Sequence, residues 1–464
     1  MAPPKSTEER AKHVLRLLEK GPLARQEILA SQKGAISQPS FSRTVRALQD
    51  DILMWGKGRN CRYGRRRPID GVETPILVFH VQESGDILTV GNLWPIFPEA
   101  FVFESKNWAH LNGLYQGMPW FLEHTRPSGF LGRQIPQRHP QISPQKDIRL
   151  WTDDTCLKFA THYGDALPGS LICGKPALER MLSFQASSQP RGVLLSERAK
   201  AYPELALGQL ESAVTSSSAE GEQAKFLTTI VDESRNVLVK FSPTMGTPVG
   251  QRIADLLVAE RLALETLGQA GLRAAQCATF EYGNRVFLES TRFDRTPTGG
   301  RRPVHSLFAL AAQYTGLEKG WYETSLALIA QGVIPKSEKR PIATLEAFGH
   351  LIANADMHLH NLAFESQECH VTQLAPAFDM LPMLFYPHSH HVAEPAWALD
   401  GATLSRLPSE AWMEARPLAE TFWHKVATSS FISAGFRGVA QSMKEKVTQL
   451  SGLLSRLPSG GDVG

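Results

Sequence analysis

Polar side chains crowd into one short segment, NADMHLHN at residues 354–361, which has apolar segments on both sides. Asp356 could act as a general base, and Asn361, five residues later, could offer an amide oxygen to a cation. A second carboxylate, Asp379, follows eighteen residues after Asn361 in LAPAFDMLP. A base that accepts a proton and hard oxygen ligands for Mg²⁺ are the groups that phosphoryl transfer needs. The spacing therefore predicts a phosphoryl-transfer site.

A lysine and a glutamate earlier in the chain fit the same chemistry. A predicted strand ends at Lys240, within the segment VLVKFSP. Glu260 lies twenty residues later in the helix-like segment ADLLVAERLALETLG. Protein kinases pair a strand lysine with a helix glutamate to fix the lysine beside the phosphates. The preceding loop, VTSSSAEGEQAK, holds Gly221, whose backbone could approach phosphates, although the chain has neither G-x-G-x-x-G nor a Walker A motif. Taken alone, Glu260 could also be a solvent-exposed helix residue.

Two other interpretations of the polar segment stay open at this point. His350, His358 and His360, with the HSHH segment at 388–391, could bind a transition metal in a hydrolase. Alternatively, the Asp and Asn side chains could do no more than cap turns in a structural loop. The metal interpretation leaves the lysine–glutamate spacing unexplained.

The elements around these residues must bring them together. The segment IATLEAFGHLIANADMHLHN is predicted to begin as a helix, with Leu345, Phe348 and Ile352 at helical spacing, and to leave the helix where the polar residues begin. LAFE is predicted to be a short strand, and LAPAFDMLP an apolar strand presenting Asp379. Residues 71–150 alternate short β-like segments with Pro- and Gly-rich turns, which predicts a small mixed sheet with long loops.

Length and composition indicate an ordinary globular protein of two or three domains, with 464 residues, 42% of them hydrophobic and 20% charged. No apolar run approaches the roughly 18 residues that span a bilayer. We therefore expect a cytoplasmic protein with no membrane partner. The five cysteines form no C-x-x-C pair, which argues against a disulfide framework and against a thiolate zinc site.

Residues 1–70 form a basic head. They contain 15 Lys or Arg and 7 Asp or Glu, a net charge of +8, and because the whole chain carries +3 the remainder carries −5. A capping-box pattern at Ser6 and Glu9 starts one amphipathic helix, and two more helices fit ARQEILASQ and SQPSFSRTVRALQDD. ILMWGKGRNCRYGRRRPI then predicts a β-hairpin. Three helices followed by a basic hairpin are the plan of a winged helix-turn-helix.

This head is predicted to bind double-stranded DNA, with the third helix in the major groove and the hairpin on phosphates. A protein-docking module with a solvated basic face is the alternative. The residues predicted to contact DNA are Ser40, Arg43, Arg46, Arg59, Arg62, Arg65, Arg66 and Arg67.

The ordered motifs SSAEGEQAKF, VLVKFSP, FLESTRFDR, NADMHLHN and LAPAFDMLP resemble the HipA family of bacterial serine/threonine-kinase toxins. The head and the stretch MPWFLEHTRPSGFLGR are most similar to the YjjJ (HipH) branch of that family. The resemblance implies an α+β, bilobal, protein-kinase-like fold behind the DNA-binding head. The expected domains are the head at 1–70, an N-terminal lobe at 71–290 and a mostly helical C-terminal lobe at 291–464.

The resemblance also implies roles for individual residues. Asp356 would be the catalytic base, His358 would lie near the transferred phosphoryl group, and Asn361 and Asp379 would bind Mg²⁺. Ser218 would be a loop serine open to autophosphorylation. The residues expected to bind ATP are Ser218, Gly221, Lys225, Lys240, Glu260 and, through its backbone at the adenine, Glu289.

The chain departs from the family pattern at three positions. His360 stands where the family often has a lysine, and Glu220 and Glu222 place carboxylates in a loop expected near phosphates. Repulsion between like charges should weaken nucleotide binding.

The resulting expectation is an ATP- and Mg²⁺-dependent kinase toxin that phosphorylates Ser or Thr of a protein and its own Ser-rich loop. Its expected partners are DNA, the protein substrate and a small HipB-like antitoxin. The alternative is a DNA-binding regulator whose kinase-like domain is inactive.

Overall fold

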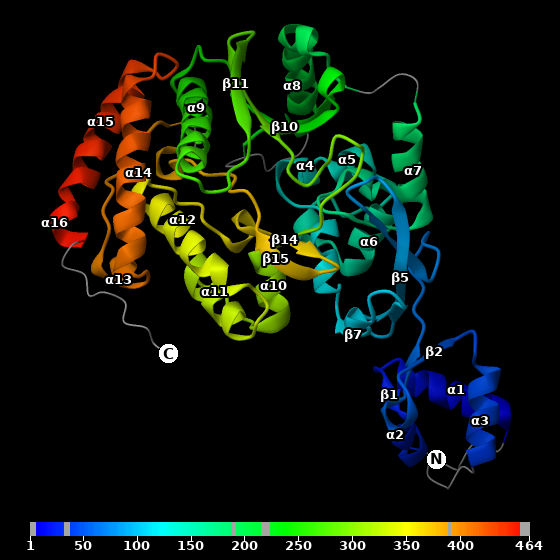
Figure 1. Cartoon of the computed structure of the whole chain (residues 1–464). Coiled ribbons are helices and arrows are strands. Elements are labelled where there is room, and N and C mark those ends of the chain that lie inside the picture. The colour runs from blue at the N-terminus through cyan, green and yellow to red at the C-terminus, as the bar shows by residue number, and fades with distance from the viewer. Residues whose placement is uncertain (1–5, 32–37, 188–191, 215–222, 388–390, 455–464) are drawn as a thin grey trace.

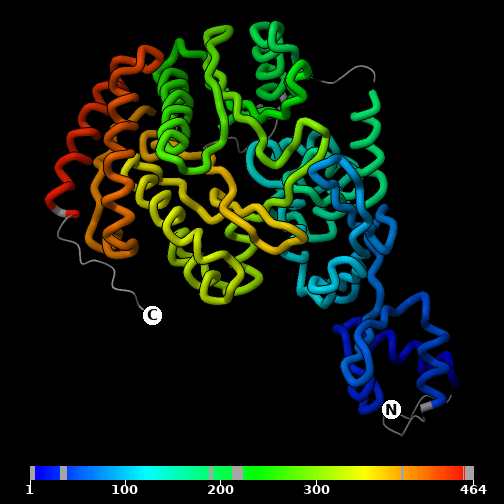
Figure 2. Tube along the Cα trace, in the orientation of Figure 1, coloured from blue at the N-terminus to red at the C-terminus, as the bar shows by residue number. Residues whose placement is uncertain are grey.

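Helices and antiparallel sheets alternate along the chain, which the computed structural model describes over residues 6–31, 38–187, 192–214, 223–387 and 391–454. Figure 1 shows the N-terminal head standing apart from a larger body, and Figure 2 follows the chain from the head into the body. The strands in these ranges form four sheets, and every pair of named strands is antiparallel. The architecture is thus a mixture of helical and sheet layers.

The head has the predicted three helices and hairpin. Its first helix starts at the predicted capping box, in which the Ser6 hydroxyl accepts from the Glu9 N–H at 3.1 Å and the Glu9 carboxylate accepts from the Ser6 N–H at 3.2 Å. Phe41 and Leu48 are buried in the small core of the head. The elements are α1 (Thr7–Leu18), β1 (Leu23–Ala24), α2 (Arg25–Ala30), α3 (Gln38–Ala47), β2 (Ile52–Trp55) and β3 (Arg62–Arg65), with sheet order β1-β3-β2.

The next part of the chain forms a five-stranded sheet with short helices beside it. The prediction of a mixed sheet here was wrong, because hairpin connections and the return of the last strand make every pair antiparallel. The strands are β4 (Ile76–Val81), β5 (Ile87–Ile96), β6 (Ala100–Glu104), β7 (Gly113–Gln116) and β8 (Leu171–Cys173), in the order β7-β6-β5-β4-β8. The helices are α4 (Gly129–Arg133), α5 (Ile135–Arg138), α6 (Asp153–Tyr163) and α7 (Lys175–Gln185).

A four-stranded sheet carries the candidate nucleotide-binding residues. Its strands are β9 (Lys225–Ile230), β10 (Arg235–Phe241), β11 (Cys277–Tyr282) and β12 (Arg285–Thr291), in the order β11-β12-β10-β9. Helix α8 (Arg198–Val214) covers one face, where Tyr202 packs among Val239 and Phe287. Helix α9 (Pro248–Gln269) begins at Thr247, whose hydroxyl accepts from the Gly250 N–H at 3.0 Å, and packs on the other side of the sheet.

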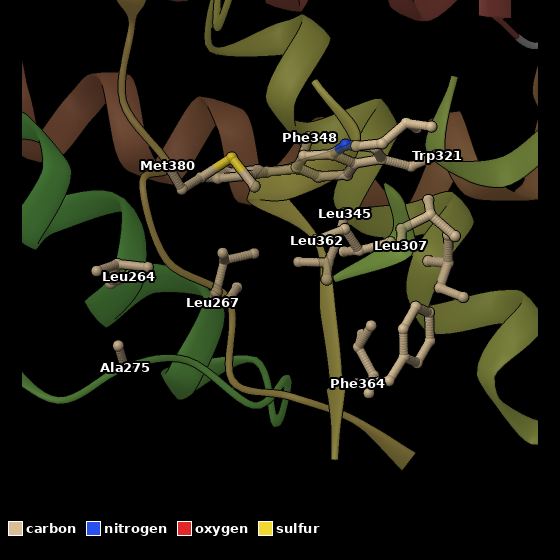
Figure 3. Packing of buried hydrophobic residues seen from close by; sticks show 14 of the residues in the cluster. Leu264, Leu267, Ala275, Leu307, Trp321, Leu345, Phe348, Leu362, Phe364 and Met380 are labelled. Carbon is tan, nitrogen blue, oxygen red and sulfur yellow. The ribbon is translucent and has the colours of Figure 1, made fainter. Parts of the chain in front are cut away.

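The C-terminal part is mostly helical, around a small sheet. The strands are β13 (Val304–Ser306), β14 (Ala363–Gln367) and β15 (His370–Leu374). The helices are α10 (Leu307–Tyr314), α11 (Trp321–Ala330), α12 (Lys339–Leu351), α13 (Gly401–Ser405), α14 (Ser409–Thr428), α15 (Ala434–Gln449) and α16 (Ser451–Leu454). Figure 3 shows Trp321 and Phe348 of this part packed near Met380, with Leu264 and Leu267 of α9 nearby. One continuous hydrophobic core therefore lies beneath both α9, which carries Glu260, and the helices of the C-terminal part.

The head is attached to the body by packing as well as by the chain. Leu53 of β2 is buried with Ile96 and Val102 of the five-stranded sheet. The backbone N–H of Arg67 donates to the carbonyl of Pro95 at 2.9 Å. In the ranges described above, no helix is long and apolar enough to cross a membrane.

Candidate active site

Lys240 of β10 is held between two carboxylates. Its Nζ donates to both carboxylate oxygens of Glu260 at 2.6 and 2.7 Å and to Oδ1 of Asp379 at 2.6 Å. The ion pair expected from the lysine–glutamate spacing is therefore present. Glu260 is only 2% exposed, so the alternative of a solvent-exposed helix residue is wrong.

The three charges shift one another's pKa values. Burial alone would lower the pKa of Lys240, but Asp379 and Glu260 together raise it above its ordinary value. Burial opposes ionisation of Asp379, yet Lys240 and then Lys225 lower the pKa of that carboxyl to about 2. Burial raises the pKa of Glu260, and the ammonium of Lys240 acts against that change. A charged lysine and a charged Asp379 thus face each other at neutral pH.

The polar segment forms a loop next to this ion pair, and Asn354 joins the two. The Nδ2 of buried Asn354 donates to the backbone carbonyl of Asp379 at 3.4 Å, and its Oδ1 accepts from the N–H of Asp356 at 3.1 Å. Asn361 in turn donates through Nδ2 to the carbonyl of Asp356 at 2.8 Å. A chain of hydrogen bonds therefore brings Asp356, Asn361 and Asp379 into one neighbourhood.

Sequence reasoning missed Asn354. The sequence signal that could have found it is an amide residue placed between the end of an apolar helix and the candidate base. Such a residue can bond to backbone on both sides of a loop.

The loop leaves Asp356 accessible while its neighbours are fixed. The Asp356 side chain is 52% exposed, and its Oδ1 lies 3.8 Å from Nε2 of His358. The indole N–H of Trp321 donates to the carbonyl of His358 at 3.0 Å and so anchors the loop on α11. An exposed carboxylate on an anchored loop can meet a hydroxyl group brought by another molecule.

The segment that presents Asp379 is not the predicted strand. Asp379 has a backbone φ of 52°, in the left-handed region that non-glycine residues seldom adopt, and lies outside every named strand. A β-strand does not allow this backbone conformation. In the turn, the carboxylate of Asp379 lies against Lys240. The unusual conformation at this candidate site residue is consistent with a local constraint.

A cavity of about 700 Å³ opens beside the ion pair. One wall is the face of the four-stranded sheet, with Lys225, Leu238 and Lys240. The opposite wall comes from the middle part of the chain, including Leu131 and Ile135. Asp379 also lines it and is 33% exposed. The size and mixed apolar and charged lining suit a nucleotide-sized ligand.

Of the residues predicted to bind ATP, Lys225, Lys240 and Glu260 line this cavity and Glu289 does not. Ser218 and Gly221 lie outside the described residues. Glu289 is paired with Val239 rather than with Lys240 across the sheet, so its side chain projects to the other face. There it is bound by Arg198 at 2.9 Å and Arg235 at 2.8 Å. Only its backbone remains available for the adenine role that the resemblance implies.

Magnesium has suitable ligands in Asp379 and Asn361. The bond from Asn361 Nδ2 commits its amide nitrogen and leaves the amide oxygen for a cation. A carboxylate and an amide oxygen are ligands that Mg²⁺ accepts, the remainder coming from water and phosphates. For the transition-metal interpretation, no group of three potential His, Cys, Asp or Glu ligands occurs in the parts of the chain that the structure describes. His360 instead stacks on Phe308, with ring centroids 4.3 Å apart.

Six of the residues predicted to contact DNA lie on the head, and the other two, Arg66 and Arg67, contact the body. Arg43, Arg46 and Arg59 are exposed on the head. Arg62 lies 3.8 Å from Glu27, and Arg65 forms an ion pair with Glu19. Ser40 is half-buried on α3.

Arg66 and Arg67 also have partners in the body, and the ion pair and low exposure of Arg67 argue against the DNA role predicted for it. The guanidinium of Arg66 lies 4.5 Å from the ring centroid of Trp94. Arg67 is paired with Asp154 and only 10% exposed. Both arginines join the head to the five-stranded sheet, because β3 leads directly into the body.

Comparisons with known proteins show the family to which the chain belongs. Residues 72–182 match the family described as YjjJ-like toxin, middle domain, and residues 217–449 match the HipA-like C-terminal domain. The chain is 34% identical over 450 residues, 95% of its length, to Toxin YjjJ of Escherichia coli (strain K12), and the match covers 98% of that protein. The chain is a YjjJ-like toxin of the HipA family. The family resemblance seen in the motifs is thereby confirmed.

Solved structures of the family and of a kinase are also similar. HipA in a complex with HipB and operator DNA from Shewanella oneidensis MR-1 matches with a TM-score of 0.50 and 12% identity, over 80% of this chain and 96% of that one. The proinflammatory kinase CtkA of Helicobacter pylori matches with a TM-score of 0.35 and 17% identity, over 49% of this chain and 92% of that one. The HipA match supports a mixed α+β, kinase-like HipA fold for the YjjJ-like chain.

Proposed function

We propose that this protein is an ATP- and Mg²⁺-dependent kinase that transfers the γ-phosphoryl group of ATP to a Ser or Thr of another protein. The observation that carries the proposal is Lys240, bound to both Glu260 and Asp379 on the wall of a nucleotide-sized cavity. Membership of the HipA-like family is consistent with this chemistry.

In this mechanism Asp356 receives the proton of the acceptor hydroxyl. The hydroxyl oxygen forms a bond to the γ-phosphorus while the bond from that phosphorus to the bridging oxygen breaks, so that ADP leaves. Lys240 stays in place beside the phosphates because Glu260 fixes it. Asp379 and Asn361 would hold magnesium, which neutralises phosphate charge when bound. Asp356 is exposed enough for a protein substrate to reach it.

Incubation of the full chain with labelled ATP and Mg²⁺ tests the proposal. The wild type should transfer label to itself or to an added protein, and Asp356→Asn should reduce the rate by at least 10²-fold because the amide cannot take the proton. Asp86→Asn, at an exposed turn, is the matched control and should label normally. Wild-type rates in Asp356→Asn would refute the assignment.

Autophosphorylation of Ser218 is part of the same proposal. Mass spectrometry of the labelled protein should find phosphate at or beside this residue. A wild-type protein that binds ATP without any transfer would favour the alternative function, a DNA-binding regulator with an inactive kinase-like domain.

We also propose that the head binds double-stranded DNA through α3. Arg43 and Arg46 are exposed on this helix, as phosphate or base contacts require. Affinity of the full chain for duplex DNA should fall steeply as salt rises, because bound phosphates release counterions. A flat salt dependence would favour the protein-docking alternative.

A small HipB-like antitoxin is the third partner that we propose. The support is the similar HipA structure, which contains HipB and operator DNA. Co-purification of a small DNA-binding protein with the full chain from its native host, and loss of kinase activity in that complex, would test this partner. Kinase activity unchanged in the complex would argue against an antitoxin role.

A further inference from the structure

The large cavity carries cations that the proposed phosphoryl transfer does not use, on the wall that comes from the middle part of the chain. Arg138 of α5 and Arg180 of α7 line the cavity, and both side chains are exposed. The lining also includes exposed His360, four residues after Asp356. A molecule that lies along this cavity can therefore meet the loop that carries Asp356 and two guanidinium groups of the middle part.

Neighbouring side chains hold the two guanidinium groups in place. Arg180 donates through Nε to Oδ1 of Asp165 at 2.9 Å, and its guanidinium carbon lies 5.5 Å from the ring centroid of Tyr163. Arg138 donates through Nη2 to Oε1 of Gln209 at 2.7 Å. A guanidinium has five N–H donors, so Arg138 keeps donors for a bound group. Its planar shape suits a carboxylate, which can accept two parallel hydrogen bonds.

One positive charge on this wall is not neutralised. Arg180 faces Asp165. Among the described residues no carboxylate lies within 4 Å of the Arg138 guanidinium, and burial lowers its pKa. The ring of His139 stacks on Tyr163 with centroids 3.9 Å apart, and burial, then Arg180 and Arg138, lower its pKa, so it is neutral at pH 7. The wall should therefore attract an anionic group.

The triphosphate of ATP has other cations available. Lys225 and Lys240 lie side by side on the sheet wall, where Asp379 and Asn361 would hold magnesium. The acceptor segment must instead bring its hydroxyl to Asp356, on the loop whose His360 lines the same cavity. Carboxylates that flank this hydroxyl can extend toward Arg138, which is exposed and reachable by another protein.

We propose that the acceptor segment of the protein substrate is acidic, and that Arg138 is a specificity-determining residue that binds one of its carboxylates. Arg180 lies beside it and strengthens the positive potential of the wall. This inference rests on the proposed kinase function and names the class of substrate that the kinase would select: Ser or Thr residues flanked by Asp or Glu.

Two fluorescent peptides that differ only in charge test the inference on the full chain. Each has one serine in a neutral, flexible sequence, and one peptide has glutamates on both sides of the serine where the other has glutamines. By fluorescence anisotropy the wild type should bind the glutamate peptide about fivefold more tightly, as expected for one charge-assisted pair at an exposed site. Arg138→Gln should bind the two peptides with nearly equal affinity. With labelled ATP and Mg²⁺, the rates of phosphate transfer should show the same preference and the same loss.

Arg149→Gln is the matched control. Arg149 is an exposed arginine of the same part of the chain, is paired with Asp147 at 2.6 Å and does not line the cavity. This variant should keep the wild-type preference. A glutamate peptide bound at the basic head would not respond to Arg138, so an unchanged preference in Arg138→Gln would overturn the inference.

Two other results also separate the possibilities. Equal affinity of the wild type for the two peptides, or a single-stranded oligothymidylate that displaces the glutamate peptide and binds more tightly through Arg138, would overturn the acidic-segment assignment. Selective binding of the glutamate peptide that depends on Arg138, without any phosphate transfer, would support the binding site and refute the proposed kinase reaction.

Discussion

Replacing Lys240 by methionine should destabilise the protein strongly, because two carboxylates lose the cation between them. Oxygens of Glu260 and Asp379 each lie within 2.7 Å of Nζ, so they face each other across a few ångströms once the ammonium is removed. Two like charges about 4 Å apart at an effective dielectric constant of about 20 repel by roughly 4 kcal/mol. Asp379 is one-third exposed and partly screened, so we expect Lys240→Met to lower the free energy of unfolding by about 3 kcal/mol at pH 7.

The assay is thermal unfolding of the full chain at pH 5 and pH 8. A loss of about 3 kcal/mol corresponds to roughly 6–12 °C if the HipA-like region, residues 217–449, unfolds as one unit. In the variant a carboxylate can relieve the repulsion by binding a proton, which raises its pKa above the unfolded value. Stability is then lost as pH rises, so the defect should be larger at pH 8 than at pH 5.

Two further variants make the test specific. Lys240→Met combined with Glu260→Gln removes the repulsion and should restore at least half of the lost stability. Lys446→Met, an exposed lysine on α15, should change stability by less than about 0.5 kcal/mol. A defect below about 1 kcal/mol in Lys240→Met, or one equal at pH 5 and pH 8, would show that the ion cluster is not a coupled buried unit.

Three other predictions address the surroundings of the site and the head. Burial raises the pKa of Glu346 to about 7, and its Oε2 accepts from the Tyr322 N–H at 2.6 Å. Because the folded state holds this proton more tightly, wild-type stability should fall as pH rises from about 4.5 to 7, by up to roughly 3 kcal/mol. Denaturant titrations should show that Glu346→Gln gains stability relative to wild type over that range, and a constant difference would contradict the argument. Asn354→Ala removes the two hydrogen bonds that join the Asp356 loop to the backbone of Asp379. If the proposed kinase mechanism holds, labelled-ATP assays should show kcat lowered tenfold or more with a smaller change in KM for ATP; unchanged kcat would argue against a positioning role. In DNA titrations at several salt concentrations, Arg43→Ala should reduce the slope of log affinity against log salt by about 1, whereas Arg67→Ala should leave it unchanged; equal effects of both variants would contradict their different placement.

Residue spacing was enough to predict the ion pair and the loop. Lys240 lies on a strand and Glu260 on the next helix, and the periodicity of both elements is plain in the sequence. Because this helix packs on the strand, the two side chains come into contact. Asp356 follows the end of a strongly apolar helix, which was predicted to include Ile352 and ends one residue earlier, at Leu351. These are features in which local pattern and tertiary packing agree.

Other features depend on tertiary contacts that no local pattern encodes. Asp379 was placed on a strand because its neighbours are apolar, but the ion pair with Lys240 accompanies a left-handed turn there. The role of Asn354 depends on two backbone groups that come together only in the fold. Arg66 and Arg67 belong to a basic run in the sequence, yet their partners Trp94 and Asp154 lie in a different part of the chain.

The packing of Leu53 and Arg67 against the body bears on how the head can be studied. A fragment cut at residue 70 would expose the apolar side chain of Leu53 to water and strip Arg67 of Asp154. Such a fragment would tend to self-associate, and the liberated guanidinium would attract nucleic acid of any sequence. Affinities measured on the isolated head would then overstate non-specific binding, so a dissected head should extend through α6, which carries Asp154, or be replaced by the intact chain.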